Sequence, residues 1–353
     1  MNRPFHLVVA LSAVILCSFA PSHCTAALPV CGSIEPEGKH VALASMRIKT
    51  PVYFMRREGQ FLKADLTNQS SKHLAEHGFG NGVSMTQSAN GRWISYLGVR
   101  AGGTRMQYWL FDRQTDSIRL VYEHPTFGAR APSFSPDSKY LVIGVSTDPR
   151  RPDAEGGLFL FDAATLRRTK LKLPVSIPEK EIGTSTMWSE DGSELLILVR
   201  SMLHNGYEVP IEYLSYRPAS KSLEKVAGRF ESQSARRAFL RNGKEIPLFE
   251  DLLPRSARAP KSEDSPGGTW HAFVENKAGS EQYVLKIRNR NGMTKTVAGI
   301  GVAYCGHMLI SGWLDEDHLV IRHRFDQHLV YEASSGKMAE LPGELKTSES
   351  FTW

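Results

Sequence analysis

The stretch Phe134–Ile143 reads FSPDSKYLVI and decides the fold of this 353-residue chain. Its first half is a tight polar turn, because serine, proline and aspartate favour turns. Its second half is an apolar strand. Consecutive apolar positions in Tyr140–Val145, and again in Leu195–Val199, indicate strands that are buried on both faces. We therefore expect antiparallel strand pairs that pack between other sheets.

The same unit recurs along the chain. Its copies lie at 188–197, 88–96 and 265–273, with a weaker copy at 313–321 and a first copy at 35–42. Successive turns are 53, 47, 54, 76 and 49 residues apart. A second landmark follows most turns: a strand that ends in a polar residue before another turn, as in Phe159–Asp162. Four short strands repeated every 40–50 residues or so are typical of propeller blades.

The repeats predict an all-β protein, a six-bladed β-propeller of four-stranded antiparallel blades. The predicted blades lie near 30–74, 83–123, 131–173, 184–227, 259–297 and 306–342. The long fourth interval holds an insertion at 228–258, between blades 4 and 5, with room for short helices. A parallel α/β fold would need helical crossovers of about a dozen residues, and the sequence between these strands does not supply them.

Two segments carry a resemblance to a known family. Ser135–Lys139 and Phe161–Thr165 are similar to blades of TolB-like propellers, and to the N-terminal propeller of prolyl oligopeptidase-type peptidases. The resemblance covers about residues 30–342 and implies the propeller fold. Because the repeats fill nearly the whole chain, we expect neither the N-terminal α/β domain of TolB nor the C-terminal hydrolase domain of the peptidases.

Residues 1–26 are predicted to be a signal peptide. Arg3 supplies a basic start, Leu7–Ala20 is apolar, and small residues near Ala26 suit signal peptidase. Residues 27–353 would then form a single propeller domain that is periplasmic or secreted; a retained N-terminal anchor is the alternative. No later stretch is apolar enough to span a membrane. The net charge of +6 is scattered rather than gathered in a dense stripe, so we expect no nucleic-acid partner.

Motifs of common catalytic sites are missing from the sequence. It contains no Gly-x-Ser-x-Gly elbow, no Walker phosphate-binding loop and no His-Glu-x-x-His. The leading hypothesis is therefore a non-catalytic binding propeller of the cell envelope. We expect a monomer without a cofactor, which binds another envelope or secreted protein as a scaffold or inhibitor.

Propellers bind ligands on loops at one end of the disc, which we call the mouth. Mouth loops join one blade to the next, or the middle two strands within a blade. The predicted binding residues at the mouth are His77, His124, Arg130, Arg150, Arg151, His204, Tyr207 and His307.

An alternative hypothesis gives three of these residues a metal. His77, His124 and His307 occupy corresponding loops and could bind a divalent ion through neutral imidazole. The chain would then be a metal-dependent enzyme on acidic glycans, similar to oligogalacturonate lyases, which are propellers with a histidine-lined metal site. The run Asp315–His318 could also suggest a metal, but its register favours a solvated blade turn.

Two of the four cysteines, Cys31 and Cys305, remain after removal of the predicted signal peptide. We place Cys31 in the inner strand of blade 1 and Cys305 just before the inner strand of blade 6. These blades are neighbours in a closed ring, so a disulfide could close it in an oxidising compartment. Two separate buried thiols are the alternative.

Overall fold

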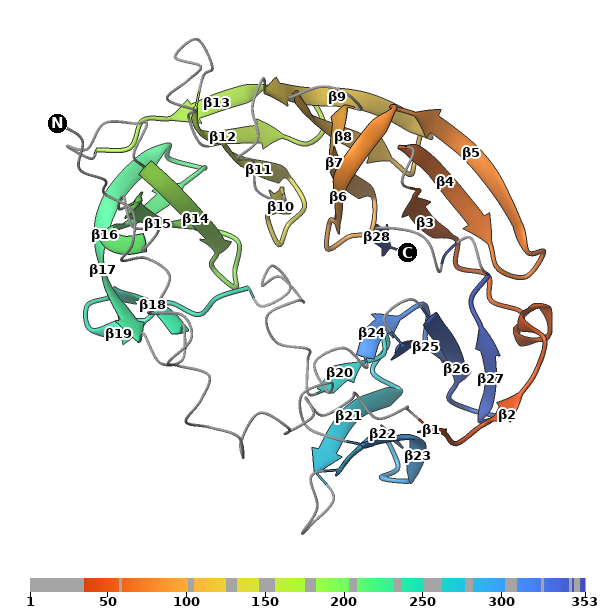
Figure 1. Cartoon of the computed structure of the whole chain (residues 1–353). Coiled ribbons are helices and arrows are strands. Elements are labelled where there is room, and N and C mark those ends of the chain that lie inside the picture. Colours follow the sequence, from red (N-terminus) through yellow and green to blue (C-terminus); the bar gives the residue numbers. More distant parts are fainter. Residues whose placement is uncertain are drawn as a thin grey trace, which may run out of the picture.

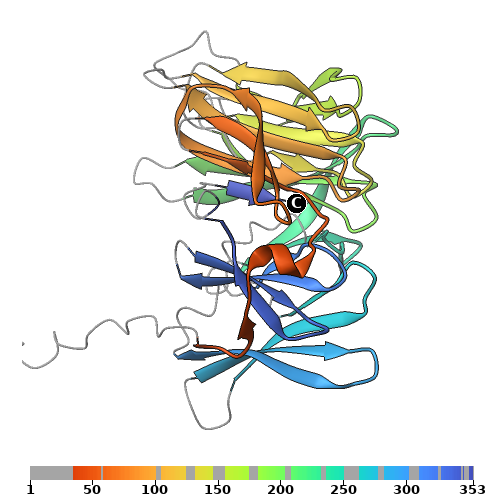
Figure 2. The ribbon, with the colours of Figure 1, turned by 90° about the vertical axis from the view of Figure 1, so that its right-hand side faces the viewer.

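The computed structural model describes residues 35–352 except 57–58, 101–104, 125–131, 146–155, 175–181, 203–207, 232–235, 250–261, 277–281, 302–309, 325–326, 343–344 and 346–349. Within this part of the chain, six sheets of four to six strands are arranged around a central axis (Figure 1). In side view the strands run across the thickness of a disc (Figure 2). The predicted six-bladed β-propeller is confirmed.

The first three blades each contain four strands, in order from the innermost to the outermost. Blade 1 contains β28 (Ser350–Thr352), β3 (Val52–Met55), β4 (Gln60–Asp65) and β5 (Ser70–Glu76). Blade 2 contains β6 (Phe79–Gln87), β7 (Trp93–Arg100), β8 (Met106–Asp112) and β9 (Ser117–His124). Blade 3 contains β10 (Ser133–Phe134), β11 (Tyr140–Val145), β12 (Gly157–Asp162) and β13 (Arg168–Leu171).

The other three blades carry additional strands. Blade 4 contains β14 (Ile182–Trp188), β15 (Leu195–Met202), β16 (Glu208–Arg217), β17 (Ser222–Glu231), β18 (Arg236–Arg241) and β19 (Lys244–Glu245). Blade 5 contains β20 (Ser262–Asp264), β21 (Trp270–Asn276), β22 (Gln282–Asn289), β23 (Thr294–Gly301) and β1 (Glu35–Pro36). Blade 6 contains β24 (Ile310–Trp313), β25 (His318–Arg324), β26 (Gln327–Glu332), β27 (Lys337–Glu340) and β2 (Lys39–His40).

The two ends of the described chain differ from the predicted blade boundaries. Residues 35–42 are not the first strand and turn of blade 1, as the repeat suggested. Glu35–Pro36 instead pairs with the outer strand of blade 5, and Lys39–His40 pairs in parallel with the outer strand of blade 6. The innermost strand of blade 1 is β28, which pairs antiparallel with β3. A C-terminal strand therefore completes blade 1 and pairs with the inner edge of β3, which would otherwise be exposed.

The prediction of short helices in the insertion 228–258 is wrong for its described residues. The strand β17 extends into it, and the hairpin β18–β19 continues the sheet of blade 4. Phe239 of this hairpin packs against Leu198 on one face of blade 4. The turn of this hairpin is Asn242-Gly243, both with positive φ, and an Asn-Gly pair is a strong hairpin signal.

Apolar clusters fill the junctions between neighbouring blades. Phe61 of blade 1, for example, lies 4.7 Å from Tyr96 of blade 2, measured between ring centroids. Similar clusters join blades 2 and 3, 3 and 4, 5 and 6, and 6 and 1. In the part of the chain that the structure describes, none joins blades 4 and 5. There the insertion hairpin, rather than a neighbouring blade, covers the apolar face of blade 4.

A recurring serine explains the turn that decides the fold. Its hydroxyl accepts a hydrogen bond from the backbone N–H five residues later, which closes the loop between the two inner strands. The four examples are Ser88 with Trp93 at 2.9 Å, Ser135 with Tyr140 at 2.9 Å, Ser189 with Glu194 at 3.0 Å and Ser265 with Trp270 at 3.0 Å. In three of them the same hydroxyl donates to Asn90, Asp137 or Asp191 two residues on.

Candidate functional site

The predicted mouth is only partly described. His77 lies between β5 and β6, and His124 is the last residue of β9. The other six predicted binding residues, Arg130, Arg150, Arg151, His204, Tyr207 and His307, lie outside the described residues, as do Cys31 and Cys305.

His77 is held among aromatic rings at the junction of blades 1 and 2. Its Nε2 lies 2.8 Å from the hydroxyl of Tyr96. Its ring centroid lies 4.2 Å from that of Trp109 and 5.2 Å from that of Phe79. Burial lowers the pKa of His77 to about 4, so the imidazole is neutral at neutral pH. In this arrangement, His77 contributes to packing between blades.

The loop that carries His77 is anchored by Phe79. This side chain is buried in the cluster that joins blades 1 and 2. A Cβ atom placed on Gly98 would overlap Cδ2 of the Phe79 ring, at a distance shorter than any real contact between two non-bonded carbon atoms. Glycine is therefore required at position 98 for the ring to fit. The Phe-Gly pairs that recur after blades 1 and 2 match this packing role at Phe79.

His124 is also buried, at the mouth end of β9. It pairs with Met106 of β8, and its ring lies 6.2 Å from that of Tyr122. Among the described residues, no group of three or more His, Cys, Asp or Glu side chains is placed to hold a metal ion. The structure does not place the third proposed ligand, His307, so the metal site stays a hypothesis.

The run Asp315–His318 lies in a blade turn, as its register indicated, but its side chains are not simply solvated. Glu316 reaches the turn of blade 5, where its carboxylate accepts hydrogen bonds from Ser265 Oγ at 2.7 Å and from Thr269 N at 2.7 Å. Burial alone would raise the pKa of Glu316, but these hydrogen bonds lower it to about 2. His318 contacts Asp315 through Nδ1 at 2.8 Å and the Met46 carbonyl through Nε2 at 3.1 Å.

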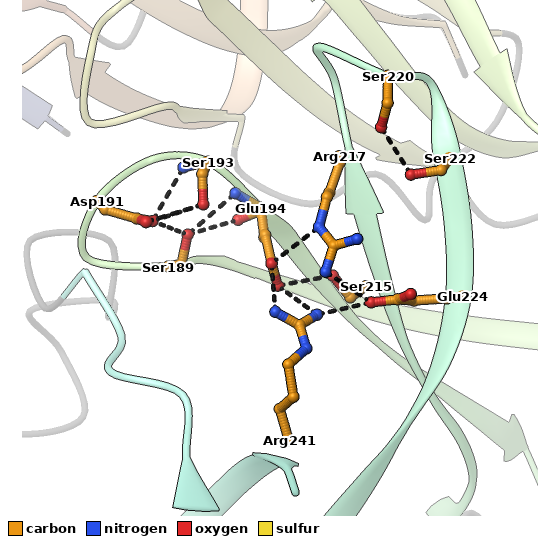
Figure 3. Close-up of polar contacts among 10 residues, drawn as sticks. All are labelled: Ser189, Asp191, Ser193, Glu194, Ser215, Arg217, Ser220, Ser222, Glu224 and Arg241. Atoms are coloured by element: carbon orange, nitrogen blue, oxygen red, sulfur yellow. Dashed lines mark hydrogen bonds and ion pairs between the residues drawn. The ribbon is translucent and has the colours of Figure 1, made fainter.

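A buried charge network that sequence reasoning missed lies in blade 4 (Figure 3). Glu194 at the start of the second strand is almost fully buried. Its carboxylate accepts hydrogen bonds from Ser215 at 2.9 Å, Arg217 Nε at 3.1 Å and Arg241 Nη2 at 2.9 Å. Arg241 also donates to Glu224 at 2.7 Å. The network joins the hairpin β18–β19 to strands β15, β16 and β17.

Hydrogen bonds keep Glu194 ionised despite its burial. Burial raises the pKa of Glu194, but the bonds from Arg241, Ser215 and Arg217 outweigh it and hold the pKa below its ordinary value. The sequence does carry one signal for this site. Glu194 stands five residues after the turn serine, where other blades have Trp93, Tyr140 or Trp270. A carboxylate at an aromatic position of a repeat implies buried partners.

Two cationic side chains at the end opposite the mouth bridge neighbouring blades. Arg119 of blade 2 donates to the carbonyl oxygens of Ala163 and Ala164 in blade 3. Lys295 of blade 5 donates to Ala333 and Ser334 in blade 6 in the same way. These contacts join blade 2 to blade 3 and blade 5 to blade 6 at this end of the disc.

Comparisons with known proteins agree with this architecture. No family model and no curated protein matches the chain in sequence. TolB from Acinetobacter baumannii aligns over 83% of this chain and 67% of its own, with 15% identity and a TM-score of 0.36. An oligogalacturonate lyase in complex with manganese aligns over 84% and 75%, with 10% identity and a TM-score of 0.38. What these proteins share with the chain is the β-propeller fold that its six sheets show.

The periplasmic gluconolactonase PpgL of Pseudomonas aeruginosa is similar too. It aligns over 86% of this chain and 98% of its own, with 15% identity and a TM-score of 0.38. At such identities the likeness concerns the fold alone. None of the helices in the described part of the propeller is long and apolar enough to cross a membrane.

Proposed function

We propose that the chain is a non-catalytic binding propeller of the cell envelope, periplasmic or secreted, which binds another protein through its mouth. One observation supports the proposal: two long cationic side chains at the opposite end, Arg119 and Lys295, are held in contacts between blades, whereas the connections from one blade to the next lie at the mouth. A partner therefore has most freedom to contact the mouth. Loops held by a rigid scaffold are the usual carriers of binding function.

The proposed binding surface consists of the predicted mouth residues other than the buried His77 and His124, with Arg150 and Arg151 as its main charges. Arginine is suited to this role, because its planar guanidinium pairs with carboxylates through two hydrogen bonds. A protein partner with an acidic surface would fit such loops. In this proposal His77 positions the loop between β5 and β6 and does not itself contact the partner, because it packs against Trp109.

The experiment compares capture of envelope proteins by the wild-type chain and by the variant R150E/R151E. A partner identified with the wild type should be lost with this variant while the melting temperature stays nearly unchanged. The control K139E lies in a turn at the opposite end and should retain the partner. Equal loss with K139E, or full retention with R150E/R151E, would show that the mouth is not the binding surface.

The metal-dependent enzyme on acidic glycans is the second candidate. It is favoured by the placement of His77 and His124 at the ends of the outer strands of successive blades, β5 and β9. With its Nε2 in contact with the Tyr96 hydroxyl, His77 would bind a metal through Nδ1. Metal analysis of protein purified without chelators tests it: stoichiometric manganese, zinc or calcium that is lost in H124A/H307A would favour the enzyme over the binding protein.

A further inference from the structure

A hollow of about 460 Å³ opens on blade 1, between its two outer strands and the segment that leads into β3. Three lysines line it: Lys49 before β3, Lys63 on β4 and Lys72 on β5. Ser70 and Ser71 contribute hydroxyl groups, and Asp65 is the single acidic residue of the lining. The lining therefore carries three positive charges and one negative charge.

Two of these lysines face each other directly. Lys63 and Lys72 are cross-strand partners in the antiparallel pair of β4 and β5. Like charges directly opposite each other destabilise a sheet, so this arrangement favours an anion between them. The ion pair of Lys72 with Asp116 is long, at 3.9 Å, and both side chains are exposed. Pairs of this kind contribute little.

Asp65 does not neutralise the lysines, because its carboxylate accepts hydrogen bonds within the turn between β4 and β5. Its Oδ1 accepts hydrogen bonds from the backbone N–H groups of Thr67 at 2.9 Å and Asn68 at 3.0 Å. Its Oδ2 accepts one from Asn68 Nδ2 at 2.7 Å. In the described residues, no ion pair joins Lys49 or Lys63 to a carboxylate. A further cation lies nearby, since Arg113 and Lys63 both stand over the ring of Tyr53.

We infer that this hollow binds a tetrahedral oxyanion, a phosphate or sulfate group, between Lys63 and Lys72. Lysine ammonium groups are compact point charges that bind such anions. Ser70 lines the same hollow, and its hydroxyl is a further hydrogen-bond donor. The site lies away from the mouth, at the turn end of blade 1, so it is independent of the proposed binding of a protein partner. The anion could be a free small molecule or the headgroup of a lipid.

The experiment titrates the full chain, without its predicted signal peptide, with inorganic phosphate and then sulfate at constant ionic strength. Calorimetry and amide chemical shifts report binding. The variant K63Q/K72Q should bind phosphate at least about tenfold more weakly, because it removes both ammonium groups that would donate charged hydrogen bonds to the anion. The control K39Q/K244Q removes the same charge from exposed lysines outside the hollow and should bind like the wild type.

Three results would overturn the inference: no saturable binding by the wild type, equal weakening in both variants, or shifted amides that lie outside β4, β5 and the segment 49–51. A sedimentation assay then distinguishes the sources of the anion. Vesicles of phosphatidylglycerol in phosphatidylcholine should retain the wild type, but not K63Q/K72Q, if the source is a headgroup. Binding of inorganic phosphate without vesicle retention supports a free anion.

Discussion

Glu35 pairs with Gly299, so the N-terminal segment runs antiparallel along the outer strand of blade 5. This changes the setting of the predicted disulfide. Cys31 precedes β1 by four residues, and Cys305 follows the end of β23 by four residues. A bond between them would fasten the N-terminal segment to blade 5, rather than join the inner strands of blades 1 and 6.

We predict that Cys31 and Cys305 form a disulfide in the exported protein. Intact mass after alkylation of the denatured, unreduced chain should show no modified cysteine once the signal peptide is removed. The chain-entropy model assigns a loop of this length a stabilisation of up to about 5 kcal/mol. The variant C31S/C305S should accordingly melt at a lower temperature. Two alkylated thiols in the unreduced wild type would contradict the prediction.

Gly98→Ala should destabilise the propeller by about 1–3 kcal/mol, because the new methyl group would overlap the Phe79 ring. Gly299→Ala is the matched control: nothing lies within 4 Å of its added Cβ, so its cost should be small. Urea denaturation measures both. In addition, Phe79→Leu in the Gly98→Ala background should cost less than it does alone, since the smaller side chain leaves room for the methyl group. Additive costs would show that the two residues do not compete for space.

Glu194→Gln should lower the free energy of unfolding by about 3 kcal/mol, because it leaves the guanidinium groups of Arg217 and Arg241 without their shared carboxylate. Glu224→Gln changes an exposed member of the same network and should cost about 1 kcal/mol or less. Because the pKa of Glu194 is lowered on folding, its contribution is present above pH 4.5 and is lost as the pH falls through the folded value. Equal costs for the two variants would contradict this division of roles.

His77 and His318 should give the stability opposite dependences on pH. The pKa of His77 falls to about 4 on folding from 6.5, so the unfolded chain binds its proton first, and stability decreases as pH falls from 6.5 to 4. For His318, burial lowers the pKa, but Asp315 and nearby carboxylates outweigh it and raise the pKa. Its contribution is present below pH 6.5 and is lost as pH rises through the folded value.

Chemical denaturation from pH 4 to 8 tests both histidines. The variant His77→Gln should be less sensitive than the wild type to acidification between pH 6.5 and 4. The variant His318→Gln should differ most from the wild type at the acid end. Parallel stability curves for His77→Gln and the wild type over this range would show that the His77 imidazole is not desolvated.

The sequence determined the number of blades and the position of most of them. The turn unit depends only on local contacts, because Ser135 and Asp137 form their hydrogen bonds within six residues. The same short sequence therefore forms the same turn wherever it recurs. The continuous apolar strands that follow could be recognised for the same reason. For this reason the spacing between successive turn units predicted the positions of blades 2 to 6 without knowledge of any long-range contact.

Only the tertiary structure decided how the ring closes and where the charges are buried. Glu35–Pro36 and Ser350–Thr352 are too short to show a strand periodicity, and their pairing depends on edges that distant segments offer. Glu194 and Arg241 are likewise 47 residues apart and meet because the insertion hairpin folds back on blade 4. A turn motif is recognisable because its hydrogen bonds are local and repeat along the chain. The long-range contacts form because pairing covers the inner edge of β3 and packing covers the apolar face of blade 4. That edge and that face exist only after the blades have formed.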